Sequence, residues 1–137
     1  MKGVLLCFGL LLLLAALAVL AHFAVIEIGQ EVVTLRTQSP DGRRTQTRLW
    51  AVDDGNSVWL HSGGTHWAQR FVGNPVVELE RAGKIRSYRA HAVPGPHPHL
   101  HALLRAKYGN ADRWVRFVGP DNATTVPVRL DPIGPDG

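Results

Sequence analysis

An uncharged apolar run near the N-terminus constrains the fold of this chain more than any other feature. From Gly3 to Ile26 no side chain carries a formal charge, and leucine, alanine and valine dominate; Lys2 precedes the run and Glu27 follows it. As a helix, about 24 residues span about 36 Å, which exceeds the roughly 30 Å hydrocarbon core of a bilayer. The sequence therefore predicts a single-pass membrane protein that contacts lipid through residues 3–26.

The same run has features of a secretory signal peptide, whose cleavage would follow Ala18 or Ala21. It continues to Ile26, however, beyond the roughly 7 to 15 apolar residues of an ordinary signal peptide. A buried core helix is not favoured, because the roughly 110 residues that follow are too few to surround a helix that is apolar on every face. We therefore expect a retained anchor. Basic residues lie on both sides of it, so the positive-inside rule does not select an orientation.

Charge and cysteine content exclude two classes of function. The chain has 15 Lys plus Arg against 11 Asp plus Glu, for a net charge of +4, and the basic residues are spread along the sequence. Such spreading is typical of a solvated surface, so no nucleic-acid partner is expected. The only cysteine, Cys7, lies in the apolar run, so neither a disulfide framework nor a cysteine metal site can form within one chain.

After the anchor, the sequence shows the alternation of strands separated by turns. Six strands are expected, at residues 31–39, 45–52, 57–62, 76–80, 85–93 and 124–130. Helical spacing predicts a short helix between the third and fourth strands, which begins at Thr65 and stops at Gly73-Asn74-Pro75. A longer helix is expected at 97–118, interrupted around Gly109-Asn110.

These elements predict a mainly β (α+β) fold, a six-stranded split antiparallel β-barrel with a short helix after strand three and a longer helix before the last strand. Three regions follow from this pattern: a transmembrane anchor at 1–28, a split-barrel domain at 29–131 and a flexible tail at 132–137, which is rich in proline and glycine.

Three stretches carry a resemblance to a known family. They are RRTQTRLW at 43–50, WLHSGG at 59–64 and WAQRFVGNPVVEL at 67–79. The most specific is the last, in which six residues separate Trp67 from Asn-Pro-x-Val at 74–77. In these stretches the chain resembles the deazaflavin-dependent nitroreductase family, part of the split-barrel flavin-binding superfamily that includes pyridoxamine phosphate oxidase. The resemblance covers residues 32–130. It implies a homodimer that holds deazaflavin (coenzyme F-420) or FMN between barrels and transfers hydride to a quinone-like or nitro substrate.

The resemblance also implies cofactor-binding residues. Basic residues that open the second strand should face the cofactor phosphate, which a guanidinium fork suits; they are Arg43, Arg44 and Arg48. The turn after the third strand should let the backbone approach the cofactor; it is Ser62-Gly63-Gly64. The following helix should supply Trp67, Arg70 and Asn74. Trp67 or Trp50 would form an apolar wall. Each has a structural alternative: surface arginines, a core tryptophan and an asparagine that ends a helix.

The chain departs from the family in the loop before the short helix, where His66 directly precedes Trp67 and the loop is shortened, and at the N-terminus, where an anchor replaces an amphipathic region. No residue can be assigned as a catalytic acid or base. The alternative function is therefore a non-catalytic, membrane-tethered barrel that binds a small ligand, heme or a protein partner.

Two other chemistries are less favoured. Four histidines lie near the start of the longer predicted helix: His91, His97, His99 and His101. His97 and His101 would share a helix face at i and i+4, but the proline-rich entry and the lack of an HExxH pattern favour a polar loop and helix start over a metal site. Hydrolase chemistry is not favoured, because Ser62 lacks a Gly-x-Ser-x-Gly elbow.

Overall fold

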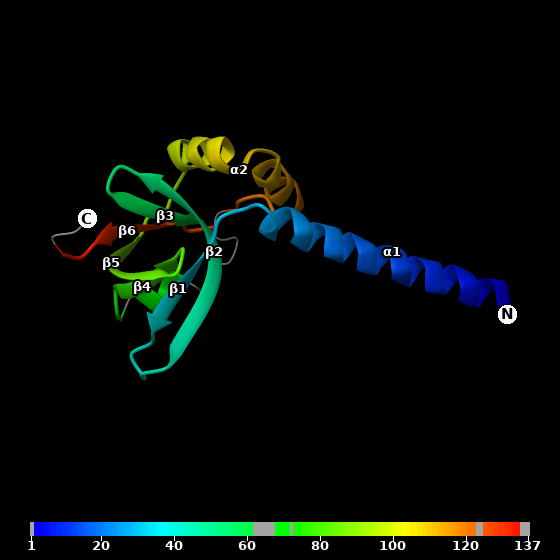
Figure 1. Ribbon diagram of the computed structural model, residues 1–137, viewed down its shortest axis with the longest axis horizontal. Helices are drawn as coiled ribbons and strands as arrows, with labels where there is room; N and C mark the ends of the chain where they lie inside the picture. Colours follow the sequence, from blue (N-terminus) through cyan, green and yellow to red (C-terminus); the bar gives the residue numbers. More distant parts are fainter. Residues whose placement is uncertain (1, 62–67, 72, 123–124, 135–137) are drawn as a thin grey trace. The chain divides into compact units, whose positions relative to one another are not determined.

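The computed structural model describes residues 2–61, 68–71, 73–122 and 125–134, and the chain forms two compact units that divide between Gln30 and Glu31 (Figure 1). The first unit is a single helix, α1, Lys2–Glu27. Its leucine, valine and phenylalanine side chains are exposed all round, and no part of its most apolar stretch is buried. By length and composition α1 can cross a membrane, although a signal sequence near an N-terminus has the same properties.

The second unit is a closed antiparallel barrel with two helical segments (Figure 1). Its strands pair in the order β1-β2-β3-β6-β5-β4, and every neighbouring pair is antiparallel. The strand bounds are β1 Val32–Gln38, β2 Arg44–Asp54, β3 Ser57–His61, β4 Val76–Arg81, β5 Lys84–Ala92 and β6 Val128–Pro132. A 3-10 turn, η1, Ala68–Phe71, follows β3, and the helix α2, Pro98–Val118, precedes β6. The predicted fold class, with its number and order of elements, is confirmed.

The bounds predicted for the last strand are wrong. The last strand covers Val128–Pro132 rather than residues 124–130, so it begins later and extends two residues further than expected, with Asp131 and Pro132 paired to β5. Pairing decides this, because Leu130 lies opposite Val58 on one side and Ala90 on the other. The short helix is only one 3-10 turn in its described part, and the expected start at Thr65 lies outside the described residues.

Alternation along the strands places the main core inside the barrel. On β1, Val33, Leu35 and Thr37 are buried while the residues between them are only partly covered. This period of two is what a strand with one face on a core requires. The fully or almost fully buried interior residues of the other strands include Ala51, Leu60, Val77, Leu79, Val128 and Leu130.

A second apolar cluster lies outside the barrel, where α2 packs on β2 and β3. Leu100, Leu104 and Tyr108 recur at helical spacing on the buried side of α2 and contact Val52. Trp50 and Trp59 pack at the edge of the cluster. The ring of Trp50 stacks on that of Tyr108, with centroids 4.3 Å apart and an interplanar angle of 11°. Trp50 therefore covers one edge of the contact between α2 and β2.

Gly109 explains the interruption predicted in the longer helix. It has φ +52° and ψ −118° within α2, a left-handed conformation that side chains with a Cβ rarely adopt. The kink ends the first helical stretch directly after Tyr108, so that the following residues take a new direction.

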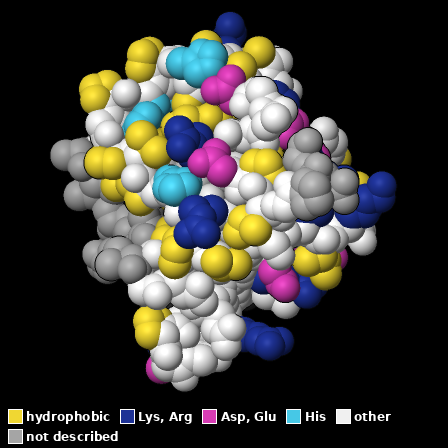
Figure 2. Space-filling model, turned by 90° about the vertical axis from the view of Figure 1, so that its left-hand side faces the viewer, with side chains coloured by type: hydrophobic (Ala, Val, Ile, Leu, Met, Phe, Trp, Pro, Cys, Tyr) yellow, Lys and Arg dark blue, Asp and Glu magenta, His cyan; other side chains and the backbone are white. Residues whose placement is uncertain are grey.

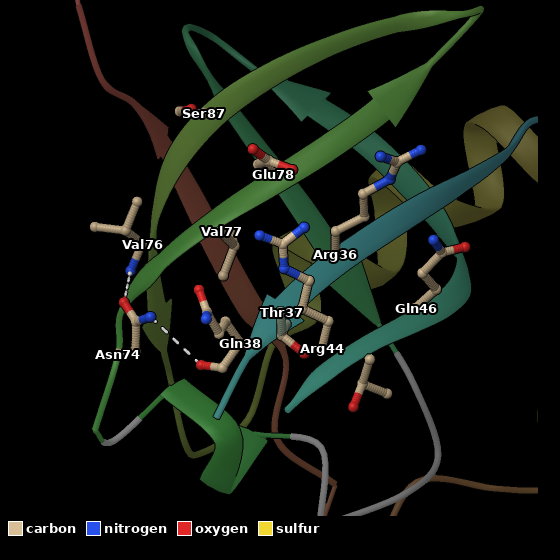
Figure 3. Close-up of a pocket in the computed structure, with 11 residues that line it drawn as sticks. Arg36, Thr37, Gln38, Arg44, Gln46, Asn74, Val76, Val77, Glu78 and Ser87 are labelled. Carbon is tan, nitrogen blue, oxygen red and sulfur yellow. Dashed lines mark hydrogen bonds between the residues drawn. The ribbon is translucent and has the colours of Figure 1, made fainter. Parts of the chain in front are cut away.

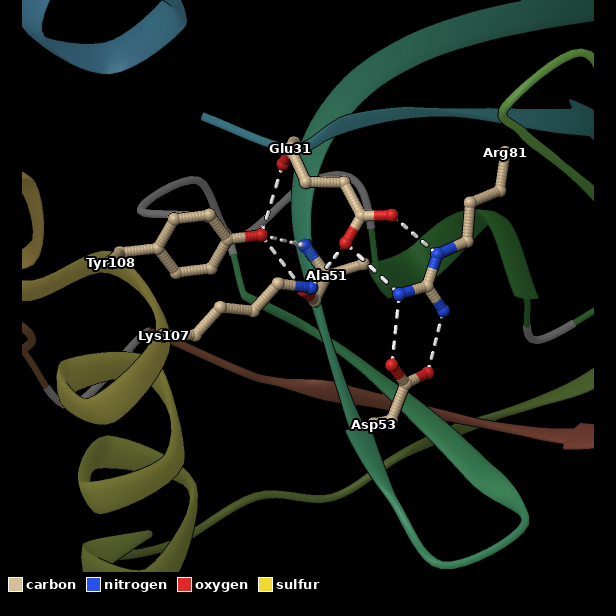
Figure 4. A network of polar contacts seen from close by, with 6 residues as sticks. All are labelled: Glu31, Ala51, Asp53, Arg81, Lys107 and Tyr108. Atoms are coloured by element: carbon tan, nitrogen blue, oxygen red, sulfur yellow. Dashed lines mark hydrogen bonds and ion pairs between the residues drawn. The ribbon is translucent and has the colours of Figure 1, made fainter. Parts of the chain in front are cut away.

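Tyr108 also fixes α2 to the barrel through its hydroxyl group (Figure 4). The backbone N–H of Ala51, which is fully buried, donates to this hydroxyl at 3.0 Å. The hydroxyl lies 2.8 Å from the Ala51 carbonyl and 3.0 Å from the Glu31 carbonyl, either of which can accept its proton. Burial raises the pKa of Tyr108 to about 12. The hydroxyl thus stays protonated, and able to donate, far above neutral pH.

Beside Tyr108, a charged network joins the residue before β1 to β2, β4 and α2 (Figure 4). Arg81 binds the Glu31 carboxylate at 2.5 and 2.9 Å and the Asp53 carboxylate at 2.6 and 2.8 Å. Lys107 contacts Glu31 as well and donates to the Ala51 carbonyl at 2.6 Å. Hydrogen bonds from Arg81 lower the pKa of both Glu31 and Asp53, and the two carboxylates raise the pKa of Arg81.

Replacing Arg81 with methionine should therefore reduce the acid sensitivity of the fold. Carboxylates with a lowered folded pKa stabilise the native state above their unfolded pKa of about 4, and this contribution is lost as pH falls through the folded values. We expect a loss of about 1 kcal/mol near neutral pH, limited by partial exposure, and almost none near pH 2. Denaturant unfolding between about pH 7 and pH 2 measures both. Arg113→Met, which replaces an exposed arginine of α2, is the control. If it changed the pH dependence of the free energy of unfolding as much as Arg81→Met does, the effect could not be assigned to the contacts of Arg81 with Glu31 and Asp53.

Candidate functional site: a basic groove on the barrel

The surface charges of the molecule are mixed in sign. Figure 2 shows basic, acidic and histidine side chains interspersed with hydrophobic ones on one face. On β5 and β6, for example, Asp131 lies 3.0 Å from Arg129 and 3.4 Å from His91. Where charges of both signs alternate, a ligand is recognised by a few placed side chains rather than by a broad field.

A groove of about 280 Å³ lies over β1, β2 and β4 near the β1–β2 turn (Figure 3). The strand register creates it, because Arg36 pairs with Gln46 and with Glu78, and Gln38 pairs with Arg44. Paired residues share one face of a sheet, so these side chains all project outward from the barrel. The lining residues are Arg36, Thr37, Gln38, Arg44, Thr45, Gln46, Asn74, Val76, Val77, Glu78 and Ser87.

Two arginine side chains in this groove have donors that find no partner among the described residues. In the part of the chain that the structure describes, no hydrogen bond or ion pair is made by the Arg44 guanidinium, which reaches over β1 in Figure 3. Arg36 binds Glu80 at 2.5 Å through Nη2, yet its Nε is buried and unpaired among the described residues. Thr37 Oγ1 also has no partner among the described residues, but its side chain lies on the core-facing side of β1 with Val33 and Leu35. On the outer face, the Arg44 guanidinium and Arg36 Nε are therefore donors that a polar or anionic group could use.

Asn74 closes one end of the groove. Its Nδ2 donates to the Gln38 carbonyl at 3.4 Å, and its Oδ1 accepts from the Val76 N–H at 3.3 Å (Figure 3). The neighbouring Gly73 permits a close approach, since a Cβ there would lie 2.6 Å from Pro40 Cγ in the β1–β2 turn. Asn74 thus connects the residues just before β4 with the end of β1, and its side chain forms one end of the groove.

Comparison with known proteins identifies the fold of the barrel. No model of a known protein family matches the sequence, and no curated protein matches it. The heme storage protein HutZ from Vibrio cholerae is similar in structure, with a TM-score of 0.60 and 14% identity over 78% of this chain and 84% of that one. An F420-H2 dependent reductase matches with a TM-score of 0.58 and 14% identity, over 74% and 94% of the two chains. The chain has the split-barrel fold.

A third similar split barrel is a putative pyridoxamine 5'-phosphate oxidase from Listeria innocua, with a TM-score of 0.56 and 16% identity over 82% of this chain and 90% of that one. At such identities the likeness is one of fold. It relates this barrel to proteins described as a reductase, an oxidase and a heme storage protein, and the chemistry of this chain has to be argued from its own groove.

The split barrel brings together two of the residues predicted to bind a cofactor, Arg44 and Asn74, which line one groove. Arg43 is not among the lining residues; it lies in the turn before β2, exposed, with its backbone N–H 3.2 Å from Asp41 Oδ1. Arg70 donates to Thr47 Oγ1 at 3.1 Å.

The other predicted site residues are separate from the groove or outside the described structure. Arg48 lies further along β2 and is not part of the lining. Trp50, named as a possible apolar wall, stacks on Tyr108 instead. The turn Ser62-Gly63-Gly64 and Trp67 lie outside the described residues, so their predicted roles stay predictions.

Sequence reasoning missed most of the groove, including Arg36, Thr37, Gln46 and Glu78. A signal for part of it was present. The tight turn at Pro40-Asp41-Gly42 sets the register of the hairpin, and a two-residue period from that turn places Arg36, Gln38, Arg44 and Gln46 on one face. Nothing local in the sequence indicates that β4 adds Glu78 on the other side.

Proposed function

We propose that this protein is a membrane-anchored split-barrel oxidoreductase whose outer groove binds the phosphate of a deazaflavin or of FMN. One observation carries the proposal: the Arg44 guanidinium points into a groove that contains no ion-pair partner for it among the described residues. A guanidinium offers five donors in a fork that matches a phosphate, and such charge-assisted bonds are the strong ones.

The remaining groove atoms suit the same group. Arg36 Nε is an unpaired donor among the described residues and lies on the same outer face as Arg44, so it can also bind a phosphate oxygen. Glu78 carries the opposite charge, so it would repel a phosphate at its own position and favour one held toward Arg44. The two ends of the groove thus differ in charge, so a phosphate would bind at the Arg44 end and away from Glu78.

The size of the groove supports a homodimer. Ligand pockets usually enclose roughly 300 to 1,000 Å³, so a groove of about 280 Å³ suits the phosphate end of a flavin-type cofactor rather than the whole molecule. The ring system would then lie between two copies of the barrel, as the resemblance to the deazaflavin-dependent nitroreductases implies. The open outer face of β1, β2 and β4 is available for such pairing.

The reaction class follows from the cofactor. When bound, a deazaflavin or flavin supplies hydride transfer, here to a quinone-like or nitro substrate. The chain's own residues would bind the phosphate, set the direction of the cofactor and cover it. Through α1 the barrel would stay close to a bilayer, where apolar quinones are concentrated.

Titration of the full-length protein in detergent with FMN and with a deazaflavin tests the phosphate role. Arg44→Ala should weaken binding about 10- to 100-fold, since a hydrogen bond to a charged group contributes roughly 1.5 to 3 kcal/mol. Arg43→Ala is the matched control, because this arginine is next in sequence but does not line the groove, and its effect should stay below about twofold. Equal losses in both variants would contradict the groove as the phosphate site.

The alternative is a non-catalytic barrel that binds heme, and the similarity to the heme storage protein HutZ favours it over other binding functions. Absorbance spectra of the purified protein, before and after addition of FMN, deazaflavin or heme, separate the two. A flavin-type chromophore at one per chain supports the oxidoreductase. A heme spectrum with no response to either flavin would replace the oxidoreductase with a heme-binding function.

A further inference from the structure

We propose a second site, a zinc site formed by His61, His101 and Asp121. Three segments far apart in the sequence meet there: His61 is the last residue of β3, His101 lies in the first turn of α2, and Asp121 lies in the segment between α2 and β6. The groove over β1, β2 and β4 contains none of these residues. The proposal is therefore independent of the proposed cofactor.

The ligand atoms converge. His61 Nε2 lies 3.1 Å from Asp121 Oδ1, and His101 Nε2 lies 2.8 Å from Asp121 Oδ2. One ligand atom from each of the three residues lies within 4.8 Å of the other two. Around a tetrahedral ion with bonds of about 2.0 Å, neighbouring ligand atoms are roughly 3.3 Å apart, so only small movements are needed. The two imidazole rings meet edge to face, with centroids 5.9 Å apart.

The chemistry of the three groups fits zinc. Two imidazoles and one carboxylate are ligands that zinc prefers, and three protein ligands leave a fourth position for water or another molecule. The side chain of His61 is only 14% exposed, so solvent competes weakly for it.

The fourth position has room. His101 and Asp121 border a cavity of about 430 Å³ that is also lined by His97, Asn122 and Thr125. His97 Nε2 is buried and has no hydrogen-bond partner among the described residues. An unpaired imidazole nitrogen in the wall of this cavity suits a water or small polar molecule on the metal. The cluster thus has the composition of an open zinc site.

Arg116 is the group that opposes a cation. Its Nη1 lies 3.3 Å from His101 Nδ1 and 3.4 Å from Asp121 Oδ2, and its Nε binds Asp112 at 2.9 Å. With zinc on Nε2, His101 would carry its proton on Nδ1 and could no longer accept from Arg116. The contact between Arg116 and His101 must therefore be given up when the metal binds. This predicts that Arg116 weakens zinc binding without preventing it.

The test is a zinc titration of the full-length protein in detergent, stripped of metal and read against a chromophoric chelator. We expect one zinc ion per chain, with Kd at or below about 1 μM. His61→Gln and Asp121→Asn should each lower the affinity roughly 100-fold or more, because metal sites are sensitive even to changes around the ligands. Arg116→Gln should raise it severalfold. Co²⁺ in place of zinc should give the visible absorption of a tetrahedral ion.

Two histidines serve as matched controls. His91 and His99 each lie beside a single carboxylate, Asp131 at 3.4 Å and Asp54 at 3.1 Å, away from the cluster. His91→Gln and His99→Gln should bind zinc as the parent does. Circular dichroism of each metal-free variant checks that the barrel is folded. Absence of zinc binding in the parent would overturn the proposal, and so would unchanged affinity in a folded His61→Gln variant. An Arg44→Ala variant that loses FMN binding should still bind zinc as the parent does, because the groove and the zinc site share no residue.

Discussion

Replacing Tyr108 with phenylalanine is expected to lower the free energy of unfolding by about 2 kcal/mol, because it leaves a buried donor without its acceptor. The Ala51 N–H is fully buried and donates to the Tyr108 hydroxyl at 3.0 Å. The ring itself would remain, and with it the stacking on Trp50 at 4.3 Å between centroids. The loss therefore reports the hydroxyl group and not the packing. Denaturant unfolding, followed by circular dichroism, measures it.

A second substitution at the same position separates the two contributions. Tyr108→Leu removes the aromatic ring too, so it should cost about 0.5 to 1.5 kcal/mol more than Tyr108→Phe, the usual worth of an aromatic pair. Alkaline pH gives an independent check. A group whose folded pKa is raised stabilises the protein below its unfolded pKa and loses this contribution as pH rises toward the folded value, here about 12. The parent should lose stability above about pH 10 by this route, and Tyr108→Phe should not.

The fold could be predicted from sequence because its signals are local. Alternation along β1 and the glycine turns between strands identify the strands without tertiary information. Gly109 marks the break in α2 because the positive φ at this position is a backbone conformation that glycine adopts readily and other residues rarely do. The end of the chain was harder. Pro132 resembles a tail residue, yet it pairs opposite Tyr88, since both edges of β6 find partners when the barrel closes.

The sites were less predictable, because each needs residues from several strands or helices. Arg43 and Arg44 are neighbours of the same type, and only the start of β2 decides that Arg44 enters the groove while Arg43 stays in the turn. The histidine cluster shows the same limit. His101 was recognised among the histidines near α2, but its partners His61 and Asp121 are brought to it by the closure of β3 against β6 and by the chain after α2.

Replacing Leu104 with alanine is expected to have the largest effect of any single substitution considered, a loss of about 3 kcal/mol in the free energy of unfolding. Leu104 is 2% exposed and lies at the centre of the cluster that joins α2 to β2. Deleting most of its side chain removes buried apolar contacts and leaves a cavity that the stacked pair of Trp50 and Tyr108 cannot fill without moving. Denaturant unfolding measures the loss, and tryptophan fluorescence reports on this cluster because Trp50 and Trp59 pack at its edge.

Leu103→Ala is the matched control, since Leu103 is the neighbouring residue of α2 but is only partly buried. It should cost about 1 kcal/mol, and equal losses for the two variants would contradict the packing described for α2. The comparison also bears on both proposed sites. The cluster under α2 and the core inside the barrel are separate. If Leu104→Ala loosens α2 alone, zinc binding through His101 should weaken while FMN binding through Arg44 is kept, because only the first site takes a ligand from α2.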